Sequence, residues 1–141
     1  MDFIKAMNDF DERNKRKMEP KHPRTLTDQD FIDMHFINYW EAMSKSVYET
    51  ATEKGWHETD RTDGEFIALM HSELSEGLEA LRKDNQSDKL TDFTGIEEEL
   101  ADVIIRIMDY SQHRGLAVGG ALVAKAAFNK TRSHRHGGKR F

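Results

Sequence analysis

The chain has 141 residues, which is enough for one domain of ordinary size and too few for two. It contains no cysteine, so a disulfide framework, a thiolate zinc site and a thiol nucleophile are excluded. No apolar run approaches the roughly 20 residues of a membrane-spanning helix, and the N-terminus has no signal-peptide pattern. We therefore expect a cytoplasmic domain with no membrane partner.

The net charge of −5 is the sum of two segments of opposite sign. Residues 1–124 carry 15 lysines and arginines against 26 acidic residues, whereas residues 125–141 carry six basic residues and no acid. An acidic body with a basic ending is typical of a metal-dependent phosphate site, or of a separate tail that binds nucleic acid. The positions of the acids within the body decide between these two.

The sequence predicts an N-terminal helical extension, residues 1–24, followed by a single domain, residues 25–141. Three apolar residues spaced for one helix face are followed by two prolines that break the chain. These residues are Phe3, Met7, Phe10, Pro20 and Pro23. The role of this extension is not indicated by its composition.

Four helices follow, each with sequence signals at its boundaries. A threonine followed three residues later by an acid is the capping-box pattern that opens a helix, and a glycine or a polar loop then ends it. These signals predict helices over residues 27–55, 62–83, 94–115 and 116–131. Gly119 and Gly120 predict close approach of another backbone to the last helix. Since no segment alternates as a strand would, the sequence predicts an all-α fold with four helices in a bundle.

Apolar residues at three- and four-residue spacing predict which sides of the first two helices form the core. In the first helix the series is Ile32, Phe36, Trp40, Met43, Val47 and Ala51, and in the second it is Ile67, Met70, Leu74, Leu78 and Leu81. Glu73 and Glu76 lie on another flank of the second helix, beside Phe66, Leu69 and Ala80. Because they share that flank with apolar residues, we expect these two carboxylates to be withdrawn from solvent.

The third helix is apolar on most sides, which is typical of a buried helix. After its first turn the polar residues form one stripe: Glu99, Asp102, Arg106 and Asp109. Buried carboxylates are costly unless they are paired or bound to a metal. We therefore expect this stripe to face a cavity or another helix.

Residues three apart on a helix are neighbours, so Glu73/Glu76 and Glu99/Asp102 form two matched pairs. Four converging carboxylates would repel one another strongly, and divalent cations are the natural compensation. Oxygen ligands without a thiol select Mg²⁺, or Mn²⁺ as a substitute, over Zn²⁺. A di-iron site is disfavoured because neither helix carries the Glu-x-x-His pattern of such bundles.

The two acidic pairs and the basic ending resemble the sequence pattern of a known family. Glu73-x-x-Glu76, then 22 residues, then Glu99-x-x-Asp102 is similar to the signature of the MazG-like all-α nucleoside triphosphate pyrophosphohydrolases, which include phage-encoded MazZ-type members. The strings HSELSEGLEA and EELADVIIRIMD resemble the metal-binding helices of that family, and KAAFNKTRSHRHGGKRF resembles its C-terminal pattern. Ser133 stands where the family pattern has proline.

The resemblance implies that the chain hydrolyses a (d)NTP between its α- and β-phosphates, giving a nucleoside monophosphate and pyrophosphate. The four acids would hold Mg²⁺, and Glu73 or Glu76 would be the catalytic base, with Glu73 favoured by the resemblance. Basic and amide residues of the ending would hold the β- and γ-phosphates: Lys125, Asn129, Lys130, Arg132 and His136, the last two in the basic tail, residues 131–141. Trp56 is a candidate for stacking on the base, with a purine deoxynucleotide such as dGTP weakly favoured.

Two other classes of function stay open. The chain could be a helical oligomer that binds nucleotides, or docks a partner, without turnover. Binding of nucleic acid by the basic ending is disfavoured by the acidic body and by the lack of interleaved aromatic residues. We expect at least a homodimer or homotetramer, because four helices of this size offer more apolar surface than one small bundle buries, and because the resembled family builds its sites at dimer interfaces.

Overall fold

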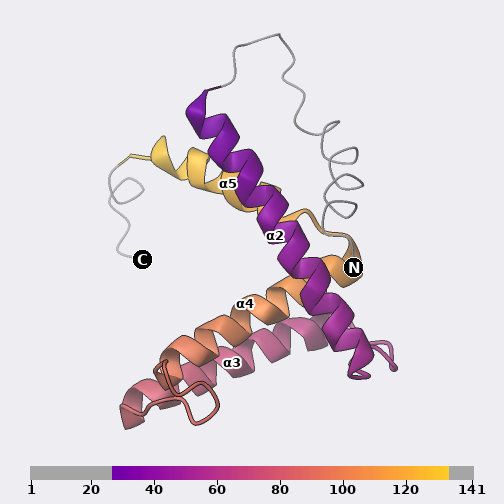
Figure 1. Cartoon of the computed structure of the whole chain (residues 1–141), viewed down its shortest axis with the longest axis vertical. Helices are drawn as coiled ribbons and strands as arrows, with labels where there is room; N and C mark the ends of the chain where they lie inside the picture. Colours follow the sequence, from indigo (N-terminus) through magenta and orange to yellow (C-terminus); the bar gives the residue numbers. More distant parts are fainter. Residues whose placement is uncertain (1–26, 134–141) are drawn as a thin grey trace. The chain divides into compact units, whose positions relative to one another are not determined.

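The computed structural model describes residues 27–133, and within them the chain is all-α, as predicted. Figure 1 shows the four helices, and their bounds are α2 (Asp28–Glu53), α3 (Asp63–Lys83), α4 (Gly95–Arg114) and α5 (Val118–Lys130). No strand forms in this part of the chain, although Gln86 and Thr94 make an isolated bridge in the α3–α4 loop. The predicted N-terminal extension and His136 lie outside the described residues.

The capping boxes that the sequence predicts are all present. Thr62 and Thr94 each accept a hydrogen bond from the backbone N–H three residues on, and the acid at that position bonds back to the threonine N–H. Thr27 and Asp30 exchange the same pair of bonds at the start of α2. These bonds satisfy backbone donors that no helical carbonyl can reach, which is why the helices begin there.

The helices end where the backbone turns left-handed. Gly115, with φ of 66°, follows α4 and donates its N–H to carbonyls of the last turn, and Gly55, with φ of 80°, follows α2. Glycine adopts this conformation without steric cost. α3 ends instead at Asp84, whose φ of 49° is tolerated because a short polar side chain can bond locally.

The chain divides into two compact units, one of them residues 43–116. In this unit α3 and α4 pack side by side as a helical hairpin, seen in Figure 1. The two helices join around Phe66, which is 4% exposed and lies 5.1 Å from the ring of Tyr110 between centroids. Met108 is the other large apolar side chain that is buried here. This hairpin carries all four predicted metal ligands.

The other unit, residues 1–42 and 117–141, contains the first half of α2 together with α5. A Cβ at Gly119 would lie 2.9 Å from Cδ1 of Trp40, so the two helices approach closely only because this residue is glycine. The predicted close approach is therefore confirmed at Gly119. It is not seen at Gly120, where a Cβ would meet no heavy atom of residues 27–133 within 4 Å.

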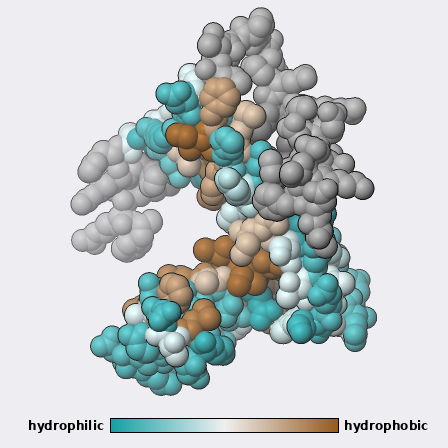
Figure 2. Space-filling view, viewed as in Figure 1, coloured by the Kyte–Doolittle hydropathy of each residue, from teal (hydrophilic) through white to brown (hydrophobic). Residues whose placement is uncertain are grey.

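The predicted core series of α2 and α3 are largely wrong within one copy of the chain. On α3 the exposed fraction is 44% for Ile67, 48% for Leu74, 51% for Leu78 and 60% for Leu81. Ile32, Phe36 and Met43 of α2 are exposed as well. α3 instead turns its Phe66 and Glu73 side toward α4, and apolar surface stays uncovered over the hairpin (Figure 2). The periodicity identifies apolar faces but does not indicate which one the same chain covers.

Among residues 27–133, no helix combines the length and the apolar character needed to cross a bilayer.

Candidate functional site

Three of the four predicted metal ligands form one cluster on the α3–α4 hairpin. A carboxylate oxygen from each of Glu73, Glu76 and Glu99 lies within 4.8 Å of one from each of the other two. Glu73 is 7% exposed, Glu99 is half-buried and Glu76 is exposed, so the cluster opens to solvent on one side. The prediction that the acidic flank of α3 is withdrawn from solvent is confirmed for Glu73 and wrong for Glu76.

Gly77 is what lets the two helices bring these acids together. A Cβ at Gly77 would lie 3.0 Å from Cδ1 of Ile96 and 3.4 Å from Cβ of Glu99. Glycine in a helix interior costs about 1 kcal/mol relative to alanine, so its presence needs a packing reason. Here the reason is close approach of α4 beside Glu76. This mid-helix glycine is a sequence signal that could have located the helix contact.

Asp102, the fourth predicted ligand, lies one turn after Glu99 on α4 and is half-buried. Burial raises the pKa of the Asp102 carboxyl, and repulsion from Glu73 raises it further. Burial also raises the pKa of Glu99, followed by repulsion from Glu76 and the other acids. Both shifts disfavour the ionised form, as expected where like charges share a site. A divalent cation would reverse this preference.

Arg106 links the acidic cluster to the next part of the site. Its Nε donates a hydrogen bond of 2.9 Å to Oε1 of Glu73, which gives that buried carboxylate an opposite charge. The same guanidinium lies 4.6 Å from the centroid of the Trp56 ring. Arg106 therefore connects a metal ligand on α3 with the aromatic residue that the sequence singled out.

A cavity of about 410 Å³ lies beside the cluster, between the second half of α2, the loop that follows it, and α4. Its lining includes Val47, Thr50, Trp56, Asp102, Arg106 and Asp109. The prediction that the polar stripe of α4 faces a cavity is therefore confirmed for its last three members. The α2 side of the wall mixes apolar residues with two hydroxyl groups and a lysine, and the α4 side is mostly charged, which suits a partly polar ligand.

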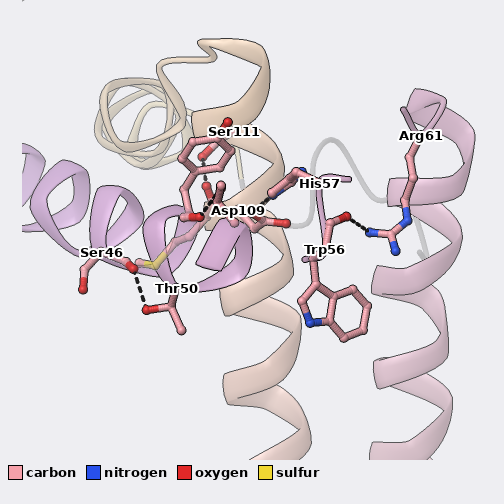
Figure 3. Close-up of polar contacts among 10 residues, drawn as sticks. Ser46, Thr50, Trp56, His57, Arg61, Asp109 and Ser111 are labelled. Atoms are coloured by element: carbon pink, nitrogen blue, oxygen red, sulfur yellow. Dashed lines mark hydrogen bonds and ion pairs between the residues drawn. The ribbon is translucent and has the colours of Figure 1, made fainter. Parts of the chain in front are cut away.

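Trp56 projects from the loop after α2 and is 41% exposed (Figure 3). Besides Arg106, the guanidinium carbon of Arg61 lies 5.2 Å from the ring centroid, and Nη1 of Arg61 donates to the Trp56 carbonyl at 2.8 Å. A base that stacks on this indole must share it with, or displace, one of the two guanidinium groups.

His57 fastens this loop to α4. Its Nε2 lies 2.8 Å from Oδ1 of Asp109, and both side chains are about nine-tenths buried (Figure 3). The His57 ring stacks on His113 at 4.6 Å between centroids and lies 4.9 Å from Tyr48. The sequence gives Asp109 a place in the polar stripe but does not indicate its partner, because that partner lies 52 residues away in a loop.

A second charged contact on α4 was not predicted. Glu98, 6% exposed, accepts hydrogen bonds from the Ser87 hydroxyl and, at 3.0 Å, from the Lys89 ammonium. The Ser87 bond is the first cause, and the Lys89 bond the second, of a lowered pKa at Glu98. The sequence places Glu98 only in the first turn of this helix, outside the polar stripe, and indicates no partner for it.

The predicted phosphate-binding residues lie in the other unit of the chain. Lys125, Asn129 and Lys130 are exposed on α5, and the Lys125 ammonium lies 5.0 Å from the Phe128 ring centroid. Arg132 follows the end of α5, in the basic ending where the sequence places it. Their approach to the acidic cluster stays a prediction.

A scan against models of protein families, a search of curated proteins and a search of solved structures each find no match to this chain. Function therefore has to follow from the chain's own residues.

Proposed function

We propose that this chain is a Mg²⁺-dependent pyrophosphohydrolase of the MazG-like type, which cleaves a (d)NTP to a monophosphate and pyrophosphate. The observation that carries the proposal is the cluster of Glu73, Glu76 and Glu99, with carboxylate oxygens within 4.8 Å of one another, beside a cavity that Asp102 and Trp56 line. A binding site for divalent cations beside a partly apolar cavity suits a ligand with phosphates at one end and a base at the other.

The donor set fits Mg²⁺ or Mn²⁺. The cluster offers carboxylate oxygens only, which hard divalent cations prefer, and Asp102 would complete it. Bound there, the metal would neutralise charge on the phosphates and lower the pKa of an attacking water. Glu73 is already bonded to Arg106, whereas Glu76 is exposed. Glu76 is therefore the better placed of the two predicted bases to accept a proton from water.

The cavity would take the nucleoside. Trp56 and Arg106 would contact the base and the sugar-proximal phosphate, because both line the cavity and Arg106 reaches the acids as well. A guanidinium in this position can stabilise charge that develops on the α-phosphate. The contacts suit any base with a planar face, so the weak preference for dGTP rests on the resemblance alone.

Product analysis tests the proposal. The protein is incubated with each of the eight common NTPs and dNTPs and Mg²⁺, and monophosphate, diphosphate, pyrophosphate and phosphate are resolved. We expect monophosphate and pyrophosphate from the wild type, none from Glu99→Gln or Asp102→Asn, and full activity from Glu79→Gln, an exposed acid of α3 outside the cluster. Diphosphate with phosphate would contradict the bond assignment. Binding without any product would favour a non-catalytic nucleotide-binding module.

We also propose that the chain is a homo-oligomer built on the α3–α4 hairpin. Two antiparallel helices with an uncovered leucine face are half of a four-helix bundle, and a second copy supplies the other half by two-fold symmetry. Leu74 and Leu78 are both about half exposed on this face. Light scattering should give at least a dimeric mass, and Leu78→Lys should lower it. A monomeric wild type would contradict the expectation.

A further inference from the structure

Lys89 reaches from the α3–α4 loop to the helix that carries Glu99 and Asp102. Its ammonium lies 3.0 Å from Oε1 of Glu98, the residue immediately before Glu99, while its own side chain is 72% exposed. The contact holds one end of the side chain against α4 and leaves the rest in solvent. The Lys89 ammonium therefore lies next to the acidic cluster, on the side of the hairpin loop.

The backbone under Lys89 is held in place. The Ser87 hydroxyl accepts hydrogen bonds from the N–H groups of Lys89, at 3.2 Å, and of Leu90, at 2.7 Å, and it donates to Glu98. The Ser87 N–H donates to the Phe93 carbonyl at 3.0 Å. The loop is thus closed by its own bonds, and the long lysine side chain can change partner without moving the backbone.

The same acids that would hold a metal act on this ammonium. The hydrogen bond to Glu98 is the first cause of a raised pKa at Lys89, and the charges of Asp102 and Glu99 add to it. Lys89 is therefore positively charged at neutral pH and lies within the field of the cluster. Once divalent cations offset the charges of Asp102 and Glu99, the exposed ammonium has donors left for an anion beside its bond to Glu98.

Helix α4 sets the order of these groups along the site. Asp109 and Arg106 line the cavity, Asp102 and Glu99 follow toward the N-terminus, and Glu98 with Lys89 comes last. Glu98 and Asp109 are 11 positions apart and so lie about 16 Å from each other along the helix axis, which matches the length of an extended nucleoside triphosphate. A nucleotide with its base in the cavity and its α-phosphate at the acids would point its terminal phosphates toward Lys89.

We propose that Lys89 binds the terminal phosphates of the substrate and the leaving pyrophosphate, and so makes the site prefer triphosphates to shorter nucleotides. This inference rests on the proposed function for its substrate, and it adds a phosphate-binding residue from the hairpin loop to those expected in the basic ending. Lysine binds phosphate as a point charge and needs no second donor to do so.

The test is direct binding of Mg²⁺-pyrophosphate, measured by isothermal titration calorimetry on the wild type, Lys89→Ala, Lys89→Arg and Lys83→Ala. Lys83 is the matched control, because it is 64% exposed at the end of α3 and its ammonium lies 3.3 Å from Glu79. We expect Lys89→Ala to weaken pyrophosphate binding about 10-fold, with Lys89→Arg and Lys83→Ala within about twofold of wild type. Lys89→Ala should also raise KM for the triphosphate while leaving kcat within about threefold.

The outcomes separate this inference from the proposed function. Wild-type turnover with unchanged pyrophosphate affinity in Lys89→Ala overturns the role of Lys89 alone. Absence of turnover with weakened pyrophosphate binding in Lys89→Ala overturns the enzyme and supports the phosphate role. Equal loss of Mn²⁺ and pyrophosphate affinity would assign Lys89 to holding Glu98 and α4 in place, and would overturn the inference.

Discussion

The contact between His57 and Asp109 should be the strongest single bond between the Trp56 loop and α4. Replacing His57 with alanine removes a 2.8 Å bond and leaves the Asp109 carboxylate, 7% exposed, without its imidazole. It also opens a gap in the stack that His57 forms with Tyr48 and His113. Both effects destabilise the folded state.

The magnitude follows from the burial of the pair. A hydrogen bond to a charged group contributes about 1.5–3 kcal/mol, and a buried carboxylate left without its donor adds a desolvation penalty. We therefore expect His57→Ala to lower the free energy of unfolding by about 3 kcal/mol. With a urea slope of about 2 kcal/mol per molar, the midpoint of unfolding falls by about 1.5 M.

Urea unfolding followed by circular dichroism measures this loss. Asp109→Asn keeps an acceptor for the imidazole and should lose about 1 kcal/mol, and Thr59→Ala, an exposed change in the same loop, should stay within about 0.5 kcal/mol of wild type. A double-mutant cycle between His57 and Asp109 should give a coupling energy of at least about 1 kcal/mol. Wild-type stability in His57→Ala would show that this contact contributes little to the folded state, contrary to this prediction.

Three further predictions concern stability. In EDTA, Glu99→Gln should raise the free energy of unfolding by about 1 kcal/mol, because two like charges within 4.8 Å repel by about that amount in water-like surroundings. Thermal unfolding measures this change, and a lower free energy of unfolding in the variant would contradict the clustering of the acids. Burial, followed by the charge of His57, lowers the pKa of His113 from 6.5, so the stability that the neutral His113 contributes is present above about pH 6.5 and is lost as the pH falls below it. In His113→Gln the free energy of unfolding should therefore depend less on pH across that range, and an unchanged pH dependence would be evidence against this. Gly119→Ala should cost about 1–3 kcal/mol through its clash with Trp40, whereas Gly120→Ala should gain about 0.5–1 kcal/mol of helix propensity; equal midpoints in urea for these two variants would rule out the close approach.

Helix boundaries could be predicted because their causes are local. A capping box needs only a threonine and an acid three residues apart, and the boxes at Thr62 and Thr94 open α3 and α4 within a residue of the predicted start. Gly115 ends α4 for an equally local reason. α3 ends at Lys83, as the polar loop after it predicts, although a left-handed aspartate such as Asp84 is indistinguishable in sequence from any other loop residue.

The packed face of α3 could not be predicted from periodicity. The helix has one apolar line through Leu74 and Leu78 and another flank that mixes Phe66 with acids. Periodicity favours the purely apolar line, but within one chain α4 covers the mixed flank, where Gly77 allows close approach. Which face a neighbouring helix covers depends on the loop and on the assembly, and neither is visible in a single helix.

The candidate site was predictable where it depends on spacing within a helix. The pairing of Glu73 with Glu76 follows from the helical repeat, and Glu99 joins them because its helix packs directly on α3. Lys89 and His57 were not assigned their partners, because both lie in loops whose course is set by tertiary bonds. Contacts between a loop and a helix carry no periodic signal.

The proposed function depends on the acids of the α3–α4 hairpin forming one binding site for divalent cations. Titration of Mn²⁺ with electron paramagnetic resonance of the free ion tests it without any substrate. We expect binding by the wild type, loss of that binding in Glu99→Gln and in Asp102→Asn, and wild-type affinity in Glu79→Gln. Equal Mn²⁺ binding in all four proteins, or none in the wild type, would contradict it.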